Sequence, residues 1–172
     1  DPEKLTVPVS PSRIETIHKS PLDWFVSAAR AEAQTDTSRS LGTLIHAIAE
    51  EYPDADYMTL RGQLEERLST LALPDTWEGQ QIRECAEKMV DKLAVYINEI
   101  MPGDHRELVG VEGSFRVLVP GDAVNAQISG RVDRLEKTED GRYVIVDLKT
   151  GKTKPNKNQI AEHAQLAAYQ VA

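Results

Sequence analysis

The sequence predicts an α/β (α+β) protein whose first 105 residues are mainly helical and whose residues 106–172 form a sheet and one further helix. From Leu41 to Met101, apolar residues recur every three or four positions, as on the buried faces of amphipathic helices. Pro102-Gly103 interrupts this pattern, and between Val109 and Leu148 β-branched and apolar residues gather in short runs typical of strands. We therefore expect one domain, a central and mainly antiparallel or mixed sheet flanked by helices.

Serine–proline pairs and leucine stripes mark the helices of the first half. Ser10-Pro11 and Ser20-Pro21 each offer an N-cap serine followed by a proline at the first helical position, which predicts two short helices. The polar run 33–40 is predicted to be a loop. Three longer helices are expected after it: from about Leu41 to Glu51, along Leu60, Leu64, Leu68 and Leu71 up to Pro74, and from about Thr76 to Met101.

Composition excludes several classes of protein. The sequence contains no run of eighteen apolar residues that could cross a membrane, and its first residues contain neither a Met nor a signal-peptide core. We therefore expect a cytoplasmic protein with more chain upstream. The single cysteine, Cys85, excludes an internal disulfide and is predicted to be a buried small apolar residue. The net charge of −8 argues against a protein that coats DNA by bulk charge.

The second half contains two predicted hairpins. Val109–Val119 and Asn125–Lys137 are expected to be antiparallel strands joined around Pro120-Gly121-Asp122. The stretch 130–152 forms the other hairpin, in which Glu139-Asp140-Gly141 is a three-residue loop with Gly141 at positive φ.

This loop predicts a cluster of charge. It places Thr138 opposite Arg142, and therefore Asp133 opposite Asp147, with Lys149 on the same face. Two facing carboxylates repel each other unless something neutralises them, which indicates a divalent-metal site. The alternative is an ordinary surface: the pattern D-x-K is common, and a slip of one residue would move the aspartates to opposite faces. The hairpin alone leaves the two interpretations balanced.

Four other features are candidates for the same chemistry. His46 lies at the edge of an apolar helical stripe, where a lone histidine is more often structural than a ligand. Glu112 lies in the first predicted strand, and its register with Asp133 is open. Gln165 and Tyr169 are four apart on a helix expected from about Asn158, where they could hold a phosphate or stack a base, or be a plain surface pair.

The fourth feature is a loop rich in glycine and lysine after the hairpin. It suits a phosphate backbone, although it could also be an ordinary solvated loop. It is not a Walker A loop, because G-x-x-x-x-G-K-[ST] is absent. The DNA contacts expected here are Arg131, Lys152, Lys154 and Lys157.

The order of the motifs is more specific than any one of them. They are, in order, S-P-S-R-I-E with P-L-D-W-F, G-T-L-I-H, G-R-V-D-R, V-I-V-D-L-K-T-G-K and Q-L-A-A-Y. Together they resemble the RecB-like branch of the PD-(D/E)XK nuclease superfamily. Within it the chain is most similar to the C-terminal nuclease domain of AddB- and AdnB-type bacterial helicase–nucleases. The resemblance covers nearly the whole chain.

The resemblance implies a restriction-endonuclease-like core and a role for each motif. Lys149 matches the catalytic lysine, Gln165 and Tyr169 match the Q-x-x-x-Y helix, and Glu112 lies near an acidic position that some members use. The metal ligands implied are His46, Asp133, Asp147 and the backbone carbonyl of Leu148. Because Ser20 stands where iron–sulfur members carry a cysteine, no iron–sulfur cluster is expected. The family fold usually continues beyond Q-x-x-x-Y, so the domain is expected to be truncated at its C-terminus.

The function implied is DNA hydrolysis, as an exonuclease, with Mg²⁺ or Mn²⁺. The expected partners are DNA, with single-stranded ends, an upstream helicase motor domain and a second helicase–nuclease subunit that together process double-strand breaks for recombinational repair. Two alternatives stay open: an inactive nuclease fold kept as a DNA-binding scaffold, and a stand-alone nuclease of the same family. The retained aspartates and lysine argue against the first.

Overall fold

The computed structural model describes residues 4–14, 36–71, 73–150 and 164–171. It divides into two units, unit 1 with residues 1–33, 113–132 and 152–172, and unit 2 with residues 34–112 and 133–151. The helix predicted at Ser20-Pro21 and the lysine-rich loop lie outside the described residues. Strands β2 (Arg106–Val119) and β3 (Asn125–Thr138) each pass through both units.

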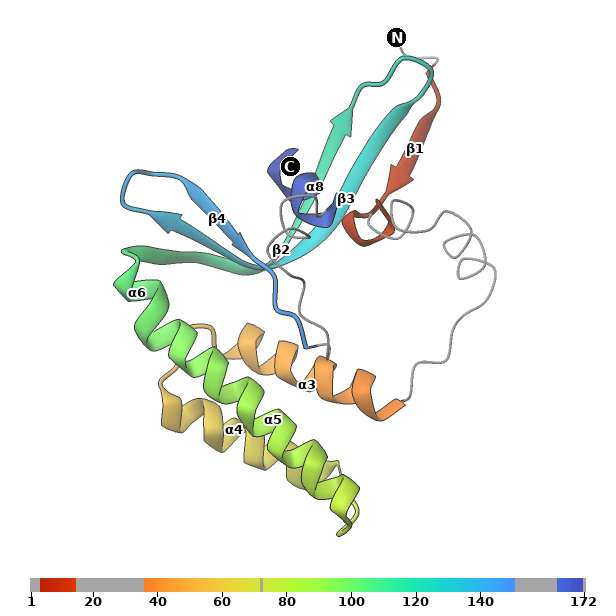
Figure 1. The fold of residues 1–172 in the computed structure, drawn as a ribbon. Helices are drawn as coiled ribbons and strands as arrows, with labels where there is room; N and C mark the ends of the chain where they lie inside the picture. The colour runs from red at the N-terminus through yellow and green to blue at the C-terminus, as the bar shows by residue number, and fades with distance from the viewer. Residues whose placement is uncertain (1–3, 15–35, 72, 151–163, 172) are drawn as a thin grey trace. The chain divides into compact units, whose positions relative to one another are not determined.

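Three long helices form the core of unit 2 (Figure 1): α3 (Asp36–Glu51), α4 (Tyr57–Thr70) and α5 (Trp77–Val95). The chain continues from α5 through the π-helical turn η1 (Tyr96–Ile100) into the short α6 (Met101–Gly103). Side chains cap two of the helices, since Asp56 accepts a hydrogen bond from the Thr59 amide and Thr76 accepts one from the Gly79 amide. The buried stripes meet at residues such as Ile48, Leu60, Leu64, Leu68 and Val90.

Two predictions about these helices are wrong. Helix α3 begins at Asp36, so the second part of the predicted loop 33–40 is helical; polar residues suit the first turn of a helix as well as a loop. Cys85 is exposed, because the buried stripe of α5 runs through its neighbour Ala86 and through Val90. One residue along a helix is a rotation of about 100°, enough to turn Cys85 to solvent.

The predicted register of the second hairpin is confirmed. Within unit 2, β3 pairs antiparallel with β4 (Tyr143–Val146), and Leu135 lies opposite Ile145. Thr138 faces Arg142, with its amide 2.9 Å from the Arg142 carbonyl oxygen, and Gly141 has φ +86°. The ladder ends at Arg134 and Val146. Asp147, Leu148 and Lys149 therefore follow the strand. The expectations that Leu148 belongs to the strand and that Asp147 pairs with Asp133 in the ladder are wrong, because the pairing stops one residue earlier.

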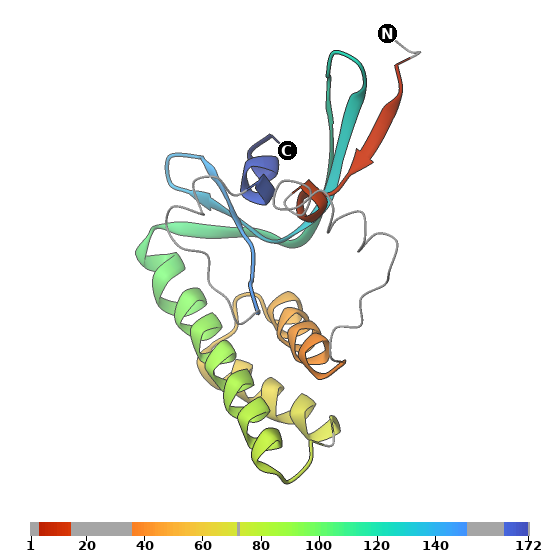
Figure 2. The ribbon, with the colours of Figure 1, turned by 45° about the vertical axis from the view of Figure 1, so that its right-hand side comes forward.

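Unit 1 contains a strand that the sequence did not predict. β1 (Thr6–Val9) pairs in parallel with β3, so that Thr6 lies beside Asn125 and Val9 beside Ile128. The predicted helix start at Ser10 is present, since residues 11–14 are helical and the Ser10 hydroxyl accepts from the Arg13 amide at 3.4 Å. Helix α8 (Ala164–Val171) is the last element (Figure 2).

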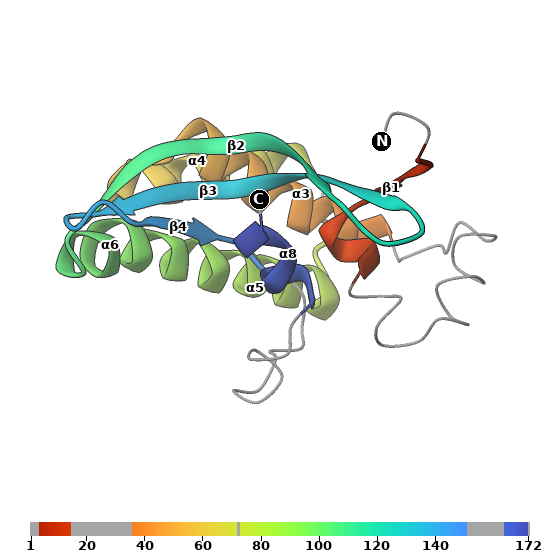
Figure 3. The same cartoon turned by 90° about the horizontal axis from the view of Figure 1, so that it is seen from above.

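The sheet is mixed, with the order β1-β3-β2 and with β4 also paired to β3. The strands β2, β3 and β4 lie beside one another when the ribbon is viewed from above (Figure 3). The mixed sheet with helices confirms the predicted fold class. No helix in the described part of the chain is both long and apolar enough to cross a membrane.

Candidate metal centre

Three side chains of unit 2 converge from three elements: His46 of α3, Glu112 of β2 and Asp133 of β3. One ligand atom from each lies within 4.8 Å of the other two, and all three residues are half-buried. Oxygen-preferring divalent cations bind their ligands at about 2.0–2.6 Å. Donors separated by up to roughly twice that length can share one ion, so the spacing and the donor types suit a divalent cation.

His46 is held at this place by the packing of its helix. Ile45 and Ile48 are buried in the helical core, which leaves His46 at the edge of the stripe. Its Nδ1 lies 3.5 Å from Oδ1 of Asp133. The hydrogen bond with Asp133 raises the pKa of His46, burial opposes this, and the negative charges of Asp133, Glu112 and Asp147 raise the pKa further. The carboxylates around the imidazole therefore favour positive charge at this position.

Asp133 is fixed from two sides. Its Oδ2 accepts a hydrogen bond of 2.6 Å from the amide of Leu148, in addition to the contact with His46. Burial acts to raise the pKa of Asp133, but the hydrogen bonds from His46 and Leu148 and the charges of His46 and Lys149 outweigh it and lower the pKa. The carboxylate therefore stays ionised, as a metal ligand must.

Glu112 takes a backbone conformation that is rare for its residue type. Its φ is +51°, in the left-handed region, although it stands within strand β2. Such a conformation costs a non-glycine residue about 1–3 kcal/mol, and residues of this kind cluster at functional sites. The register between Glu112 and Asp133 was open in the sequence, and the structure brings the two carboxylates together.

Asp147 and Lys149 form an ion pair directly after β4. Lys149 Nζ lies 2.7 Å from Asp147 Oδ2, and the lysine is more than half exposed. Between them, Leu148 packs against the helical core, which anchors this segment. Among the described residues the close ligand group contains Glu112 and not Asp147. Asp147 is nevertheless near enough to raise the pKa of His46.

A buried ionic network supports β3 next to the cluster, and sequence reasoning missed it. Glu136 is fully buried and accepts hydrogen bonds from Arg134 Nε at 2.6 Å, Tyr96 at 2.8 Å and Arg106 at 3.1 Å. Arg134, the neighbour of Asp133, also donates to the carbonyl oxygen of Pro53, just after α3. The sequence gives little signal for this network, because charged residues are common in this part of β3: five of the seven residues 131–137 are charged.

The Q-x-x-x-Y pair belongs to unit 1. Tyr169 is buried, its ring packs edge-to-face against Phe115 with centroids 5.7 Å apart, and its hydroxyl lies 3.5 Å from the Arg131 carbonyl oxygen. The ring is packed inside the protein, which does not fit the expectation that it stacks a base. The backbone of Gln165 lies in α8, and its side chain is outside the described residues, as are the predicted DNA contacts Lys152, Lys154 and Lys157.

Comparison with known proteins identifies a family for this chain. The model of the PD-(D/E)XK nuclease superfamily matches residues 8–172. No curated protein matches the chain. The matched span contains every residue of the cluster formed by His46, Glu112 and Asp133, together with the Asp147–Lys149 pair.

Proposed function

Because the chain belongs to the PD-(D/E)XK nuclease superfamily, we propose that it hydrolyses phosphodiester bonds of DNA at a divalent cation bound by His46, Glu112 and Asp133. The observation that supports this proposal is the approach of the three ligand atoms to within 4.8 Å of one another, from three separate elements. Nucleases of this superfamily use divalent metals, and the donor set of one imidazole and two carboxylates suits such an ion.

The donor set also favours particular ions. Carboxylates suit Mg²⁺ and Mn²⁺, and the imidazole makes the site more accepting of Mn²⁺ than a site made of oxygen alone. Asp147 and the backbone carbonyl of Leu148 follow β4 directly and are the further ligands we propose. The cation would lower the pKa of the attacking water and stabilise the negative charge on the leaving oxygen.

Lys149 is the residue we propose for catalysis beside the cation. Its ammonium group is held by Asp147 at 2.7 Å and more than half of the side chain is exposed, so a phosphate can approach it. A fixed cation at this place would orient the attacking water and balance the charge that develops on the phosphate. The short Leu148 bond to Asp133 ties the position of Lys149 to that of the carboxylate.

The finer assignment is an exonuclease domain of a helicase–nuclease that processes double-strand breaks. It is supported by the order of motifs from S-P-S-R-I-E to Q-L-A-A-Y, which resembles AddB- and AdnB-type domains. In this setting a motor domain would deliver single-stranded DNA ends to the cation and Lys149.

The test is incubation of the protein with linear and circular DNA, single- and double-stranded, in Mn²⁺, Mg²⁺ or EDTA. We expect cleavage that requires the metal, and for an exonuclease the linear substrates are degraded while the circles persist. Cleavage of circles would contradict the exonuclease assignment alone. If no substrate is cleaved although the protein is folded and binds Mn²⁺, the scaffold function replaces the nuclease function.

A further inference from the structure

The part of the sheet in unit 1 has two chemically different faces. Successive side chains of a strand point to opposite faces, so residues 113–119 of β2 and 125–132 of β3 each divide into two sets. One set is apolar and contains Phe115, Val117, Val119, Ala126, Ile128 and Val132. The other set, which we call the polar face, contains Ser114, Arg116, Asn125, Gln127, Ser129 and Arg131, with Leu118 among them.

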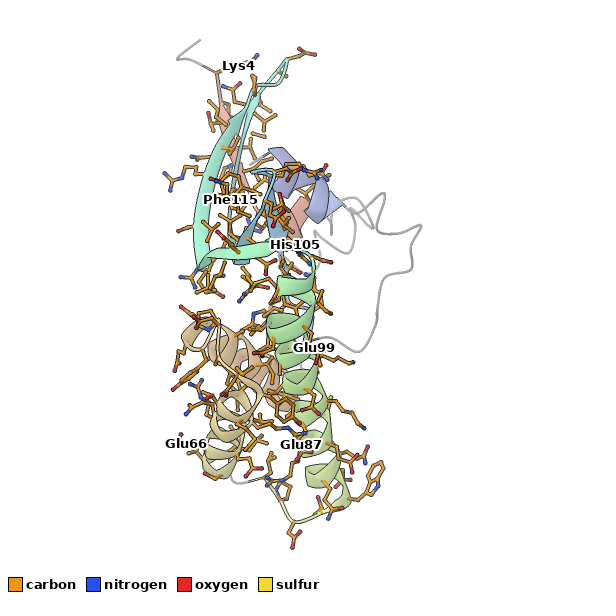
Figure 4. All side chains as sticks on the ribbon, turned by 90° about the vertical axis from the view of Figure 1, so that its left-hand side faces the viewer. Lys4, Glu66, Glu87, Glu99, His105 and Phe115 are labelled. Carbon is orange, nitrogen blue, oxygen red and sulfur yellow. The ribbon has the colours of Figure 1, made fainter. Side chains whose placement is uncertain are left out.

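The apolar face is identified by its contacts. A Cβ atom added to Gly130 would lie 3.0 Å from the Phe115 ring and 3.1 Å from Pro11, and the Phe115 ring packs against Tyr169 of α8. Ile128 and Val132 are buried. Figure 4 labels Phe115 on β2 with the side chains drawn. These contacts cover one face of the strands, and by alternation Arg116 and Arg131 lie on the opposite face, where both are exposed.

The polar face has the charge that an anion requires. None of its residues named above is acidic, in a chain that has 28 Asp and Glu against 20 Lys and Arg. Neighbouring β1 adds Thr6 beside Asn125 and Pro8 beside Gln127, again without a carboxylate. By sequence, unit 1 has nine basic and seven acidic residues, a net charge of +2, whereas unit 2 has eleven and twenty-one, a net charge of −10.

We propose that the polar face binds the phosphodiester backbone of the DNA substrate, an inference that rests on the proposed nuclease function. Arginine, serine, asparagine and glutamine are the side chains that usually contact phosphate oxygens, and such contacts position a strand without reading its sequence. Arg131 precedes the proposed ligand Asp133 by two residues in β3.

The test uses Arg116→Gln, Arg131→Gln and the double variant, with fluorescently labelled DNA in EDTA so that no cleavage occurs. Fluorescence anisotropy at several salt concentrations gives the slope of log K against log salt. Each lost phosphate contact removes about 0.9 from that slope for duplex DNA and about 0.7 for a single strand. We expect the slope of the double variant to fall by about twice the value for one contact. We also expect this variant to bind DNA about tenfold more weakly at low salt.

Matched variants separate charge from folding. Arg83→Gln removes an exposed arginine of α5 and should leave the salt slope of DNA binding unchanged. Arg116→Lys keeps the positive charge at position 116 and should also leave that slope unchanged. Leu118→Glu places a carboxylate on the polar face and should weaken binding, and Met58→Glu, at an exposed position of α4, should not. With Mn²⁺, the double variant should show a raised KM and an unchanged kcat.

The outcomes distinguish failure of the surface assignment from failure of the nuclease function. If the unaltered protein binds and cleaves DNA but the double variant keeps the full slope, the polar face is not the binding surface and the nuclease function stands. If the folded, unaltered protein neither binds nor cleaves DNA, the nuclease function fails and the surface assignment fails with it.

Discussion

The imidazole Nδ1 of His46 lies 3.5 Å from the carboxylate Oδ1 of Asp133, which links helix α3 to strand β3. The two residues are far apart in the sequence, and neither identifies a metal site alone. The Leu148 amide holds the other oxygen of Asp133 at 2.6 Å, so the carboxylate is oriented before any ion binds. Orientation of this kind is what a ligand set needs for affinity.

Replacement of Asp147 by alanine should abolish or severely weaken metal binding. Asp147 contributes negative charge at His46 and neutralises Lys149, which would otherwise repel the ion. Isothermal titration calorimetry with Mn²⁺ measures the affinity. Asp140→Ala, in the exposed hairpin loop, is the control. An Asp147→Ala protein that binds Mn²⁺ as tightly as the control would refute the role of this carboxylate.

Replacement of Lys149 by alanine should reduce cleavage by about 10²–10³-fold, the loss typical of removing one group that stabilises transition-state charge. Binding of metal and of DNA should remain measurable, because the ligand atoms of the metal cluster lie on other residues. Single-turnover cleavage at saturating DNA is the measurement. Lys137→Ala, on the exposed side of the same hairpin, is the control, and near-normal turnover of Lys149→Ala would exclude a catalytic lysine.

Two substitutions of Glu112 should separate the effect of backbone strain from the effect of losing a metal ligand. Glu112→Gly removes the carboxylate but accepts a φ of +51° without strain, so Mn²⁺ affinity should fall at least about tenfold while the unfolding temperature does not fall. Glu112→Val should lower both, because a β-branched residue is poorly tolerated at positive φ. The measurements are calorimetry for the metal and thermal unfolding by circular dichroism. Unchanged affinity in Glu112→Gly would exclude Glu112 as a ligand.

Glu136→Ala should destabilise the protein by about 3–5 kcal/mol, because it leaves the buried Arg134 without its partner. The free energy of unfolding is measured with urea in the absence of metal. Glu139→Ala, at an exposed position of the hairpin loop, should change it by less than about 0.5 kcal/mol. Equal stability of the two variants would show that the network contributes little.

Tyr96 should ionise later than an ordinary tyrosine. Burial and the hydrogen bond that it donates to Glu136, whose negative charge acts in the same direction, raise its pKa from 10.0 to about 12, while the charges of Arg106 and Arg134 oppose the shift. Because the folded-state pKa is raised, this group stabilises the fold fully below pH 10, and the contribution is lost between about pH 10 and pH 12. The difference in absorbance at tyrosinate wavelengths between the unaltered protein and Tyr96→Phe should show a group that ionises near pH 12. A midpoint near 10, in a protein still folded by circular dichroism, would contradict the burial and hydrogen bonding described.

Local patterns predicted the parts of the molecule that depend on neighbours in the sequence. The loop Glu139-Asp140-Gly141 was sufficient for the register of its hairpin, because an antiparallel ladder continues from its turn one pair at a time. The buried leucines of α4 were predicted for the same reason, since helical periodicity is a local property. The failure at Cys85 concerns the edge of a buried stripe, where a step of one residue changes the exposure of the side chain. The failure at Asp36 concerns the start of a helix, where polar residues suit the first turn as well as a loop.

Contacts between segments that are far apart in the sequence could not be predicted from local patterns. The parallel pairing of β1 with β3, the burial of Glu136 and the approach of Glu112 to His46 all depend on how whole elements pack. No local period reports the positive φ of Glu112. The sequence was therefore enough to identify Asp133, Asp147 and Lys149 as candidates. Only the tertiary structure brings His46, Glu112 and Asp133 together, because the distances between ligand atoms depend on long-range packing and not on spacing along the chain.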